Sequence, residues 1–360
     1  MHKELELDPD ACQVVDAPEP QAEMRAWSSG PKGIHAVHLD EALRLYREKC
    51  GPGVERGSEG EGQVGEVVWI DVVSPGDNEA VFLRDTLRFH PLAVEDCIRG
   101  RQRPKVDRYP GYFFLVLYAG RINTQGERSA LALNEVHVFL GERFVVTVHD
   151  RKVHEVGEVV ARWRTAPGRL HDTGTLAHAL LDAVVDAYFP VLDHFSGRVE
   201  AIEDAMLSDP RGEEDAMPGM LALRRELTVF RRVVAPQRDV LTTLLRRDIP
   251  FLRPELLPYF QDVQDHVMRV TEEIDGMREL LASAVDAFLS SASNRLNHTM
   301  RVMAAWSIIL MAMAWIAGVY GMNFHVMPEL GWRYGYAWAL GAMLAVGGVL
   351  FMFFRRRRWI

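Results

Sequence analysis

Residues 302–320 have the sequence VMAAWSIILMAMAWIAGVY and residues 334–354 have the sequence YGYAWALGAMLAVGGVLFMFF, and neither stretch contains a charged side chain. A bilayer core of roughly 30 Å needs about 20 helical residues to cross it. One such stretch can be a buried helix of a water-soluble protein. Two of them, close together at the C-terminal end, favour two transmembrane helices. The sequence therefore predicts a membrane protein that contacts the lipid bilayer.

The chain as a whole has the composition of a folded protein. Of its 360 residues, 25% are charged and 48% are apolar, which excludes a disordered or collagen-like chain. The net charge is −9, from 41 Lys and Arg against 50 Asp and Glu, so no nucleic-acid partner is expected. The three cysteines, Cys12, Cys50 and Cys97, are too few and too scattered for a disulfide framework or a zinc cluster.

Arginine side chains flank the two predicted spans at the same side of the membrane. Arg355–Arg358 follow the second span and Arg295 and Arg301 precede the first, whereas the loop 321–333 has few ionisable groups. The positive-inside rule therefore predicts that both termini, including a basic tail at 355–360, are cytoplasmic and that the loop is periplasmic. The first residues lack an apolar leader, so we expect a multi-pass protein of the cell (inner) membrane with a cytoplasmic soluble part.

The soluble part begins with two segments of different pattern. Residues 1–30 have few large apolar side chains and several prolines, and are predicted to form a loose N-terminal tail. Residues 31–165 are predicted to form a cytoplasmic α/β domain, because apolar runs typical of strands alternate with helical stretches. The expected strands are 67–71, 112–118, 135–140 and 143–148, and the expected helices are 77–88 and 91–99.

Helical periodicity then continues to the first span. Residues 166–250 are predicted to form a cytoplasmic helical hairpin, with helices at 173–207 and 213–247. After Pro258 no proline occurs before Tyr320, so residues 255–320 are predicted to form one stalk helix that continues into the first transmembrane helix. A helix of about 60 residues would be roughly 90 Å long and cannot bury its apolar side alone, so self-association is expected.

One face of this helix has an unusual side-chain pattern. Steps of three and four residues from Asn297 meet only small, polar or thioether side chains, namely Asn297, Met300, Ala304, Ser307, Met311, Ala314, Gly318 and Gly321. Such a stripe can be a packing face that lets helices approach closely. It can also line a water-filled path if several copies place it on a common axis, with methionine and alanine forming apolar constrictions.

The sequence after the first span carries a resemblance to a known family. Tyr320-Gly321-Met322-Asn323-Phe324, followed by Met327-Pro328-Glu329-Leu330 and Trp332, resembles the signature of CorA-type magnesium transporters. The resemblance extends upstream to about residue 65, through Phe288-Leu289-Ser290-Ser291-Ala292-Ser293-Asn294, Arg103-Pro104-Lys105-Val106, Glu95-Asp96 and His90-Pro91-Leu92. It therefore covers most of the chain.

The resemblance implies a homopentameric, channel-like transporter for Mg²⁺, with Co²⁺ and Ni²⁺ as secondary cargo. It implies a selectivity filter at Gly321, Met322 and Asn323, next to a periplasmic loop that contains Glu329. The family's pore-lining positions correspond to Asn297, Met300, Met303, Ser307, Met311, Ala314 and Gly318. Two residues depart from the family pattern, because Ala312 replaces a proline and His325 replaces a residue that is often acidic.

The resemblance also implies that Mg²⁺ regulates transport from inside the cell. The family's regulatory aspartates, which meet across a subunit interface, correspond to Asp96 and Asp262, and Glu95, Asp182 and His266 match neighbouring ligands. Repulsion between unmetallated carboxylates would loosen the assembly, and bridging Mg²⁺ would hold it closed. The alternative for these acidic residues is an ordinary solvated helix face.

The chemistry of the span is compatible with a hydrated hard cation. No carboxylate, histidine or cysteine lies between Val302 and Asn323, so the span offers no inner-shell ligands for a transition metal. Mg²⁺ dehydrates reluctantly and can be held through its water shell by amide and carbonyl oxygens. The alternatives are a zinc transporter of the same fold and a membrane-tethered cytoplasmic binding module. An enzyme is not expected, because no nucleophile elbow or phosphate loop is present.

Overall fold

The computed structural model describes residues 22–30, 33–50, 66–125, 128–166, 172–208, 210–246, 249, 252–322 and 331–360. The chain consists of two compact units, Met1–Leu281 and Ala282–Ile360. Asn323, predicted to belong to the selectivity filter, and Glu329, predicted to lie in the periplasmic loop, are outside the described residues. Each unit is considered in turn below.

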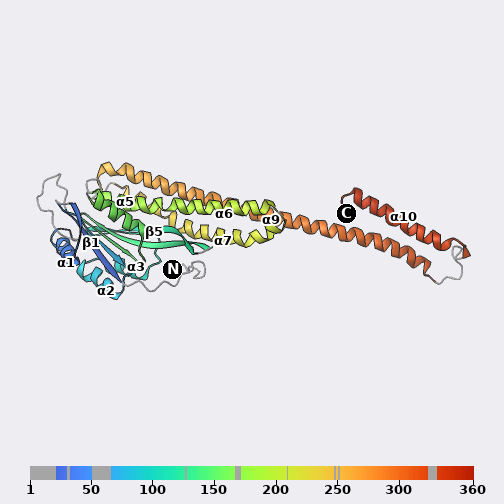
Figure 1. Ribbon diagram of the computed structural model, residues 1–360, viewed down its shortest axis with the longest axis horizontal. Coiled ribbons are helices and arrows are strands. Elements are labelled where there is room, and N and C mark those ends of the chain that lie inside the picture. Colours follow the sequence, from blue (N-terminus) through green and yellow to red (C-terminus); the bar gives the residue numbers. More distant parts are fainter. Residues whose placement is uncertain are drawn as a thin grey trace. The chain divides into compact units, whose positions relative to one another are not determined.

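The first unit is built on one seven-stranded sheet with the order β2-β1-β3-β7-β6-β5-β4. Only the central pair, β3 and β7, is parallel, and every other neighbouring pair is antiparallel. The strands are β1 Glu23–Gly30, β2 Gly33–Val37, β3 Val68–Val73, β4 Lys105–Tyr109, β5 Tyr112–Gln125, β6 Arg128–Gly141 and β7 Phe144–His149. Helices cover both faces of this sheet (Figure 1).

Both faces of the central strands are buried, which explains their continuous apolar sequences. One face, with Val68, Ile70 and Val146, packs against the helices between β2 and β4. The other face includes Trp69, whose ring lies 5.9 Å from that of Trp163 on α4. The helices on the first face are α1 Leu39–Leu45, α2 Asp77–Val81, α3 Pro91–Arg99 and the π-helical turns η2 Tyr46–Cys50 and η3 Phe82–Thr86.

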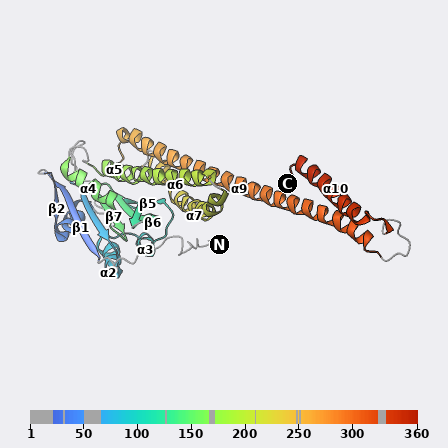
Figure 2. The same cartoon turned by 45° about the vertical axis from the view of Figure 1, so that its right-hand side comes forward.

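The second layer of helices follows β7 in the chain and lies beside the sheet in both views (Figures 1 and 2). It contains α4 His154–Thr165, α5 Thr173–Asp186, α6 Tyr188–Ser208, α7 Pro210–Val234 and α8 Gln237–Leu244. The prediction of one helix over 173–207 and one over 213–247 missed a break in each. Pro190 and Pro236 have no N–H to donate to the carbonyl four residues earlier, so each proline interrupts its helix.

The prediction of a loose tail over residues 1–30 is wrong for residues 23–30. These residues form β1, which pairs with β2 on one side and with β3 on the other. Ala26 and Trp27 are buried there, at 5% and 8% exposure. Long-range pairing with β3 supplies the stability that the mixed sequence of β1 does not indicate.

A single long helix, α9, spans Leu257–Tyr320, after a short 3₁₀ turn, η4 Pro254–Leu256. A second C-terminal helix, α10, spans Gly335–Arg356. Both are long and apolar enough to cross a membrane, and their most apolar windows are only 11% and 17% buried. A third helical stretch, Thr173–Met206, also meets this criterion, but it is 67% buried inside the first unit, which identifies it as core. The predicted order of an α/β domain, a long helix and two C-terminal apolar helices is confirmed.

Candidate ion conduit and regulatory site

The predicted pore-lining side chains lie on one exposed side of α9. Met300, Met303 and Met311 retain 64%, 65% and 69% of their surface. The remaining members of the set are also exposed, namely Asn297, Ser307, Ala314 and Gly318. We refer to these seven residues as the α9 stripe. Large apolar side chains that remain accessible within one chain mark a surface that requires a partner.

The opposite side of α9 packs against α10. Ala305 is fully buried and Ile309 is 5% exposed, and both belong to a cluster with Phe354 of α10. At Gly347, an added Cβ atom would lie 3.3 Å from the sulfur of Met313, so the two helices approach closely there. At about 100° per residue, the middle of this face is about 180° around the helix from the α9 stripe. The second span of the chain therefore leaves the stripe uncovered.

Bulky side chains occupy the flanks of α9 between these two faces. Trp306, Leu310 and Trp315 are 46%, 61% and 72% exposed. Trp306 leans toward α10, with its ring 6.2 Å from that of Phe351. Aromatic and aliphatic flanks suit lipid or a neighbouring subunit, whereas the narrow stripe between them suits a different environment.

Two groups along this face of α9 have defined hydrogen bonds. The Ser307 hydroxyl donates to the Met303 carbonyl at 2.9 Å, so its oxygen lone pairs remain able to accept from a water molecule. At the outer end, Gly321 N–H donates to the carbonyls of Ala317 and Gly318, at 3.0 and 3.2 Å, and closes the last turn of α9. Gly321 and Met322 are exposed just beyond this turn. The stripe and this exposed end share one helix.

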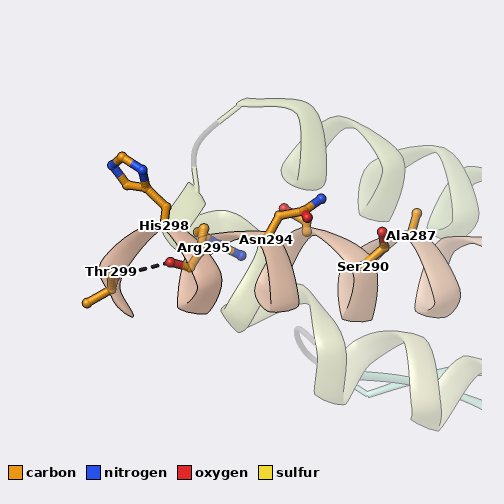
Figure 3. A pocket seen from close by; sticks show the side chains of 7 residues that line it. Ala287, Ser290, Asn294, Arg295, His298 and Thr299 are labelled. Carbon is orange, nitrogen blue, oxygen red and sulfur yellow. Dashed lines mark hydrogen bonds between the residues drawn. The ribbon is translucent and has the colours of Figure 1, made fainter. Parts of the chain in front are cut away.

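A hollow of about 760 Å³ lies along α9 before the span, but it does not belong to the stripe (Figure 3). Its lining combines polar groups with a larger apolar surface and consists of Ala287, Ser290, Ser291, Asn294, Arg295, His298 and Thr299. These residues are on the face that α10 covers further along the helix, about 180° from the stripe at about 100° per residue. The hollow is therefore separate from the candidate conduit.

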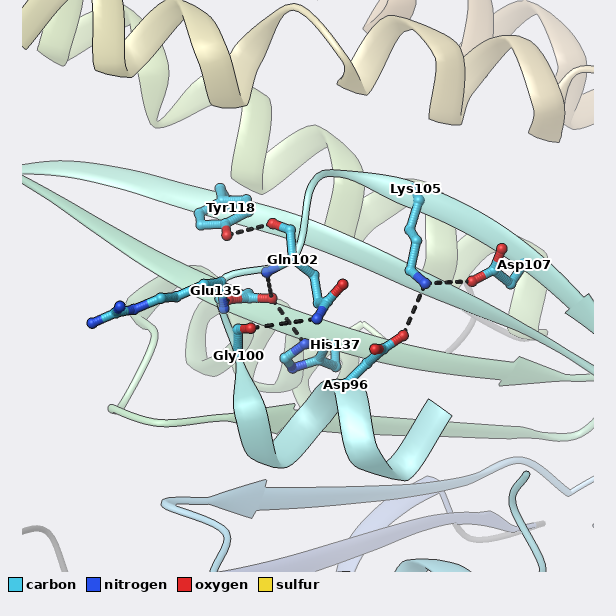
Figure 4. Close-up of polar contacts among 9 residues, drawn as sticks. Asp96, Gly100, Gln102, Lys105, Asp107, Tyr118, Glu135 and His137 are labelled. Carbon is cyan, nitrogen blue, oxygen red and sulfur yellow. Dashed lines mark hydrogen bonds and ion pairs between the residues drawn. The ribbon is translucent and has the colours of Figure 1, made fainter. Parts of the chain in front are cut away.

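The first group of predicted regulatory residues lies on α3, and Asp96 already has a cationic partner there. The Lys105 ammonium group donates to Asp96 at 2.8 Å and lies 2.7 Å from Asp107 (Figure 4). Burial lowers the pKa of Lys105, but the hydrogen bonds to Asp107 and Asp96 outweigh it and the pKa is raised. The other residue of this group, Glu95, pairs with Arg99 at 2.6 Å. A metal ion that binds Asp96 would therefore have to compete with the Lys105 ammonium group for this carboxylate.

The second group of predicted residues lies where α5 faces the start of α9. Asp182 is half-buried and Asp262 is exposed, and both act electrostatically on their neighbours. Burial and then the charge of Asp182 raise the pKa of Asp186, while His266 lowers it. The His266 Nδ1 atom lies 3.8 Å from an Asp186 oxygen, too far for a hydrogen bond. The negative charge of the carboxylates in this group is therefore only partly balanced by His266.

The structure thus brings Asp182, Asp262 and His266 together, and leaves Glu95 and Asp96 in a separate group on α3. The prediction overlooked two further members of the α5–α9 group, His178 and Asp186. Burial lowers the pKa of His178, and the charges of Asp182 and Asp262 offset part of this effect. Positions 178, 182 and 186 share one face of α5 because each is four residues from the next. This four-residue spacing can be recognised in the sequence, and it could have indicated that His178 and Asp186 belong to the group.

The donor chemistry of the α5–α9 group suits Mg²⁺, which prefers carboxylate oxygen and keeps several waters. Among the described residues, however, no three His, Cys, Asp or Glu side chains lie close enough to hold a metal ion within one chain. Burial, and to a smaller extent the charges of Asp182 and Asp262, raise the pKa of Asp186, and a bound cation would lower it. The residues of the α5–α9 group could therefore supply some of the ligands of a cation site. The remaining ligands would have to come from outside this group.

Comparison with known proteins gives consistent matches over most of the chain. A family model described as CorA-like Mg²⁺ transporter protein matches residues 64–356. The protein YfjQ of Bacillus subtilis is 36% identical over 292 residues, 81% of this chain and 89% of YfjQ. The cobalt/magnesium transport protein CorA of Thermotoga maritima is 31% identical over 298 residues, 81% of this chain and 83% of that protein.

A solved structure shares the fold described above. The CorA magnesium transporter from Methanocaldococcus jannaschii superposes with a TM-score of 0.74 at 20% identity, covering 94% of this chain and 98% of that chain. At this identity the structural similarity establishes the fold alone. The family model and the sequence relatives establish more, and together they show that the chain belongs to the family of CorA-like Mg²⁺ transporters.

Proposed function

We propose that this chain is the subunit of a homopentameric, channel-like Mg²⁺ transporter of the cell (inner) membrane, with Co²⁺ and Ni²⁺ as secondary cargo. The observation that carries the proposal is the α9 stripe, which is exposed on the face of α9 opposite α10. Five stripes around one axis would enclose a path lined by amides, a hydroxyl, thioethers and helix backbone. The orientation that follows from the flanking arginines places both termini in the cytoplasm.

The membrane potential is sufficient to drive uptake along this path. A divalent ion that crosses 100 mV gains about 4.6 kcal/mol, twice the value for a single charge. The stripe contains no ionised side chain, so a hydrated cation would meet no strong trap on the way through. The membrane potential alone is therefore sufficient to drive uptake, and no coupled energy source is required.

The proposal is tested by flux into vesicles that contain the purified full chain. An imposed inside-negative potential should drive Mg²⁺ uptake, and reversing the potential should suppress it. Uptake of Zn²⁺ in preference to Mg²⁺ would favour the zinc-transporter alternative instead. Absence of ion flux from well-folded protein would favour the membrane-tethered binding module.

The filter assignment predicts a large effect at Asn323, a residue that is assigned from sequence. The change Asn323→Ala removes the amide that would accept from the water shell of the ion. We expect Mg²⁺ uptake to fall by about tenfold or more, because a neutral polar ring is lost at the mouth. Uptake is measured in the same vesicles at equal protein content. A normal uptake rate in this variant would contradict the filter assignment.

We propose further that Mg²⁺ bound between subunits inhibits transport. Asp96 and Glu95 of one copy would meet Asp182, Asp262 and His266 of the next. Two observations support this: the charges of Asp182 and Asp262 both act on Asp186, and Asp96 pairs with the partly exposed Lys105. A divalent cation between these groups would replace repulsion across the interface with attraction.

This arrangement predicts that Lys105 weakens the regulatory site, because its ammonium group competes with Mg²⁺ for Asp96. The change Lys105→Met should lower the Mg²⁺ concentration that half-inhibits transport by roughly three- to tenfold, since one like charge near the ion is removed. The measurement is current or uptake at a series of internal Mg²⁺ concentrations. Lys152→Met is the matched control, because Lys152 pairs at 3.0 Å with Glu23, which is not among the predicted ligands. An unchanged or higher half-inhibiting concentration in Lys105→Met would contradict the prediction.

A further inference from the structure

The C-terminal end of α10 turns back on itself and presents a row of arginines. Arg358 has a left-handed backbone, with φ of 57°. Its N–H donates to the Arg355 carbonyl at 3.1 Å, and the Trp359 N–H donates to the Phe354 carbonyl at 3.0 Å. These two bonds form a Schellman turn that ends the helix. The turn stacks the Trp359 ring on Phe354, with 5.3 Å between ring centres.

This turn separates apolar from charged groups at the end of the span. Trp359 and Ile360 pack with the cluster that contains Ala305 of α9. Arg355, Arg356, Arg357 and Arg358 are exposed. The Arg357 guanidinium lies over the Phe353 ring at 5.6 Å, with its polar edge free to bind another group. The arginine heads therefore surround an aromatic and aliphatic centre.

Arg301 of α9 adds a fifth guanidinium at the same end of the helix pair. It precedes Ala305 by four residues, about 6 Å along the helix axis. Its Nε donates to the Asn297 carbonyl at 3.2 Å, and the side chain is exposed. We refer to Arg301 and Arg355–Arg358 as the arginine collar. The hollow lined by His298 and Thr299 begins within one helical turn of it, on the same face of α9 as Ala305.

The collar is not neutralised within its own unit. Among the described residues of Ala282–Ile360, the only acidic side chain is that of Asp286, fifteen residues before Arg301. That separation is about 22 Å along the helix. No ion pair of the described part of the chain involves a collar arginine. Within this unit, the guanidinium groups of the collar therefore remain available to bind an anion.

The position of the collar identifies the anion. Its four C-terminal arginines begin in the last turn of the 22-residue helix α10, directly after the uncharged part of that helix, so in a bilayer they lie at the depth of the lipid headgroups. Guanidinium groups bind phosphate through paired N–H donors, and Trp359 supplies the amphipathic ring that is typical of this interface. We propose that the arginine collar and the adjoining hollow bind the phosphate headgroups of anionic phospholipids in the surrounding leaflet.

The experiment measures how strongly the full chain selects an anionic lipid. The purified protein is reconstituted in phosphatidylcholine bilayers, and the association of spin-labelled phosphatidylglycerol is compared with that of spin-labelled phosphatidylcholine. The parent chain should favour phosphatidylglycerol by several-fold, because arginines near an anionic surface attract it. The variant Arg355→Gln, Arg356→Gln, Arg357→Gln, Arg358→Gln should lose most of this preference. An unchanged preference in that variant overturns the proposal.

Three controls establish whether the collar recognises the phosphate of a lipid. The corresponding four Arg→Lys changes keep the charge and the membrane orientation but remove the paired N–H donors, so this variant should retain a preference between those of the parent and of the Arg→Gln variant. A preference equal to that of the parent would contradict phosphate binding by the guanidinium groups. Arg333→Gln, which follows the loop at the other end of α10, should leave the preference unchanged. Inorganic phosphate should compete no better than chloride at equal ionic strength. Specific displacement of the lipid by phosphate would identify a site for soluble anions and overturn the proposal.

Discussion

A leucine at position 318 should block Mg²⁺ uptake almost completely. In the proposed assembly, Gly318 lies on the α9 stripe near the outer end of the span, so five leucine side chains would meet on one axis. Within the single chain, nothing lies within 4 Å of an added Cβ at this position. We expect uptake in vesicles to fall by about a hundredfold, since the path becomes a closed apolar constriction.

Gly348 offers a matched control for this substitution. It is a helical, exposed glycine of α10, and an added Cβ there also meets nothing within 4 Å. The two sites differ in that only Gly318 belongs to the stripe. Gly348→Leu should therefore keep most of the uptake. Equal loss in both variants, or normal uptake in Gly318→Leu at equal protein content, would contradict the conduit.

The double variant Asp96→Ala, Asp262→Ala should transport Mg²⁺ without inhibition by internal Mg²⁺. The proposed regulatory ion loses one carboxylate from each side of the subunit interface. We expect the half-inhibiting Mg²⁺ concentration to rise by about tenfold or more, because two of the anionic ligands that hold the hard cation are removed. Voltage-clamped currents at a series of internal Mg²⁺ concentrations measure this shift.

A control must remove the same charge without touching the proposed ligands. Asp193 on α6 and Asp239 on α8 are exposed aspartates outside both regulatory groups. Asp193→Ala, Asp239→Ala should leave inhibition unchanged. If the Asp96, Asp262 double variant were inhibited like the parent chain, the two residues would not form the sensor.

The helices near the membrane were the most predictable part of the fold. Their apolar runs are long, and the absence of proline after Pro258 indicates one continuous helix, as in α9. The breaks at Pro190 and Pro236 could also have been predicted, because each proline removes a donor from a helix. In contrast, β1 is mixed in sequence, and its place in the sheet depends on pairing with β3. Such pairing has no local signal.

The candidate site was predictable to a similar degree. Most of the α9 stripe follows from helical spacing, whereas Met303 was assigned from the family resemblance, and all seven residues are exposed in the structure. Its role as a conduit stays a prediction. Asp186 could have been found from its four-residue spacing to Asp182. The pairing of Asp96 with Lys105 could not, because it depends on how α3 lies against β4.

Block by Cd²⁺ of a chain with Ser307→Cys tests most directly whether the α9 stripes of several copies meet around one axis. Thiolates bind this soft ion tightly only when several converge on it. Mg²⁺ uptake by Ser307→Cys should therefore be blocked at a Cd²⁺ concentration at least about tenfold below that needed for the parent chain, and Ile308→Cys, about 100° around the helix, should behave like the parent. Equal block of both cysteine variants, or none in Ser307→Cys, would contradict a shared axial path.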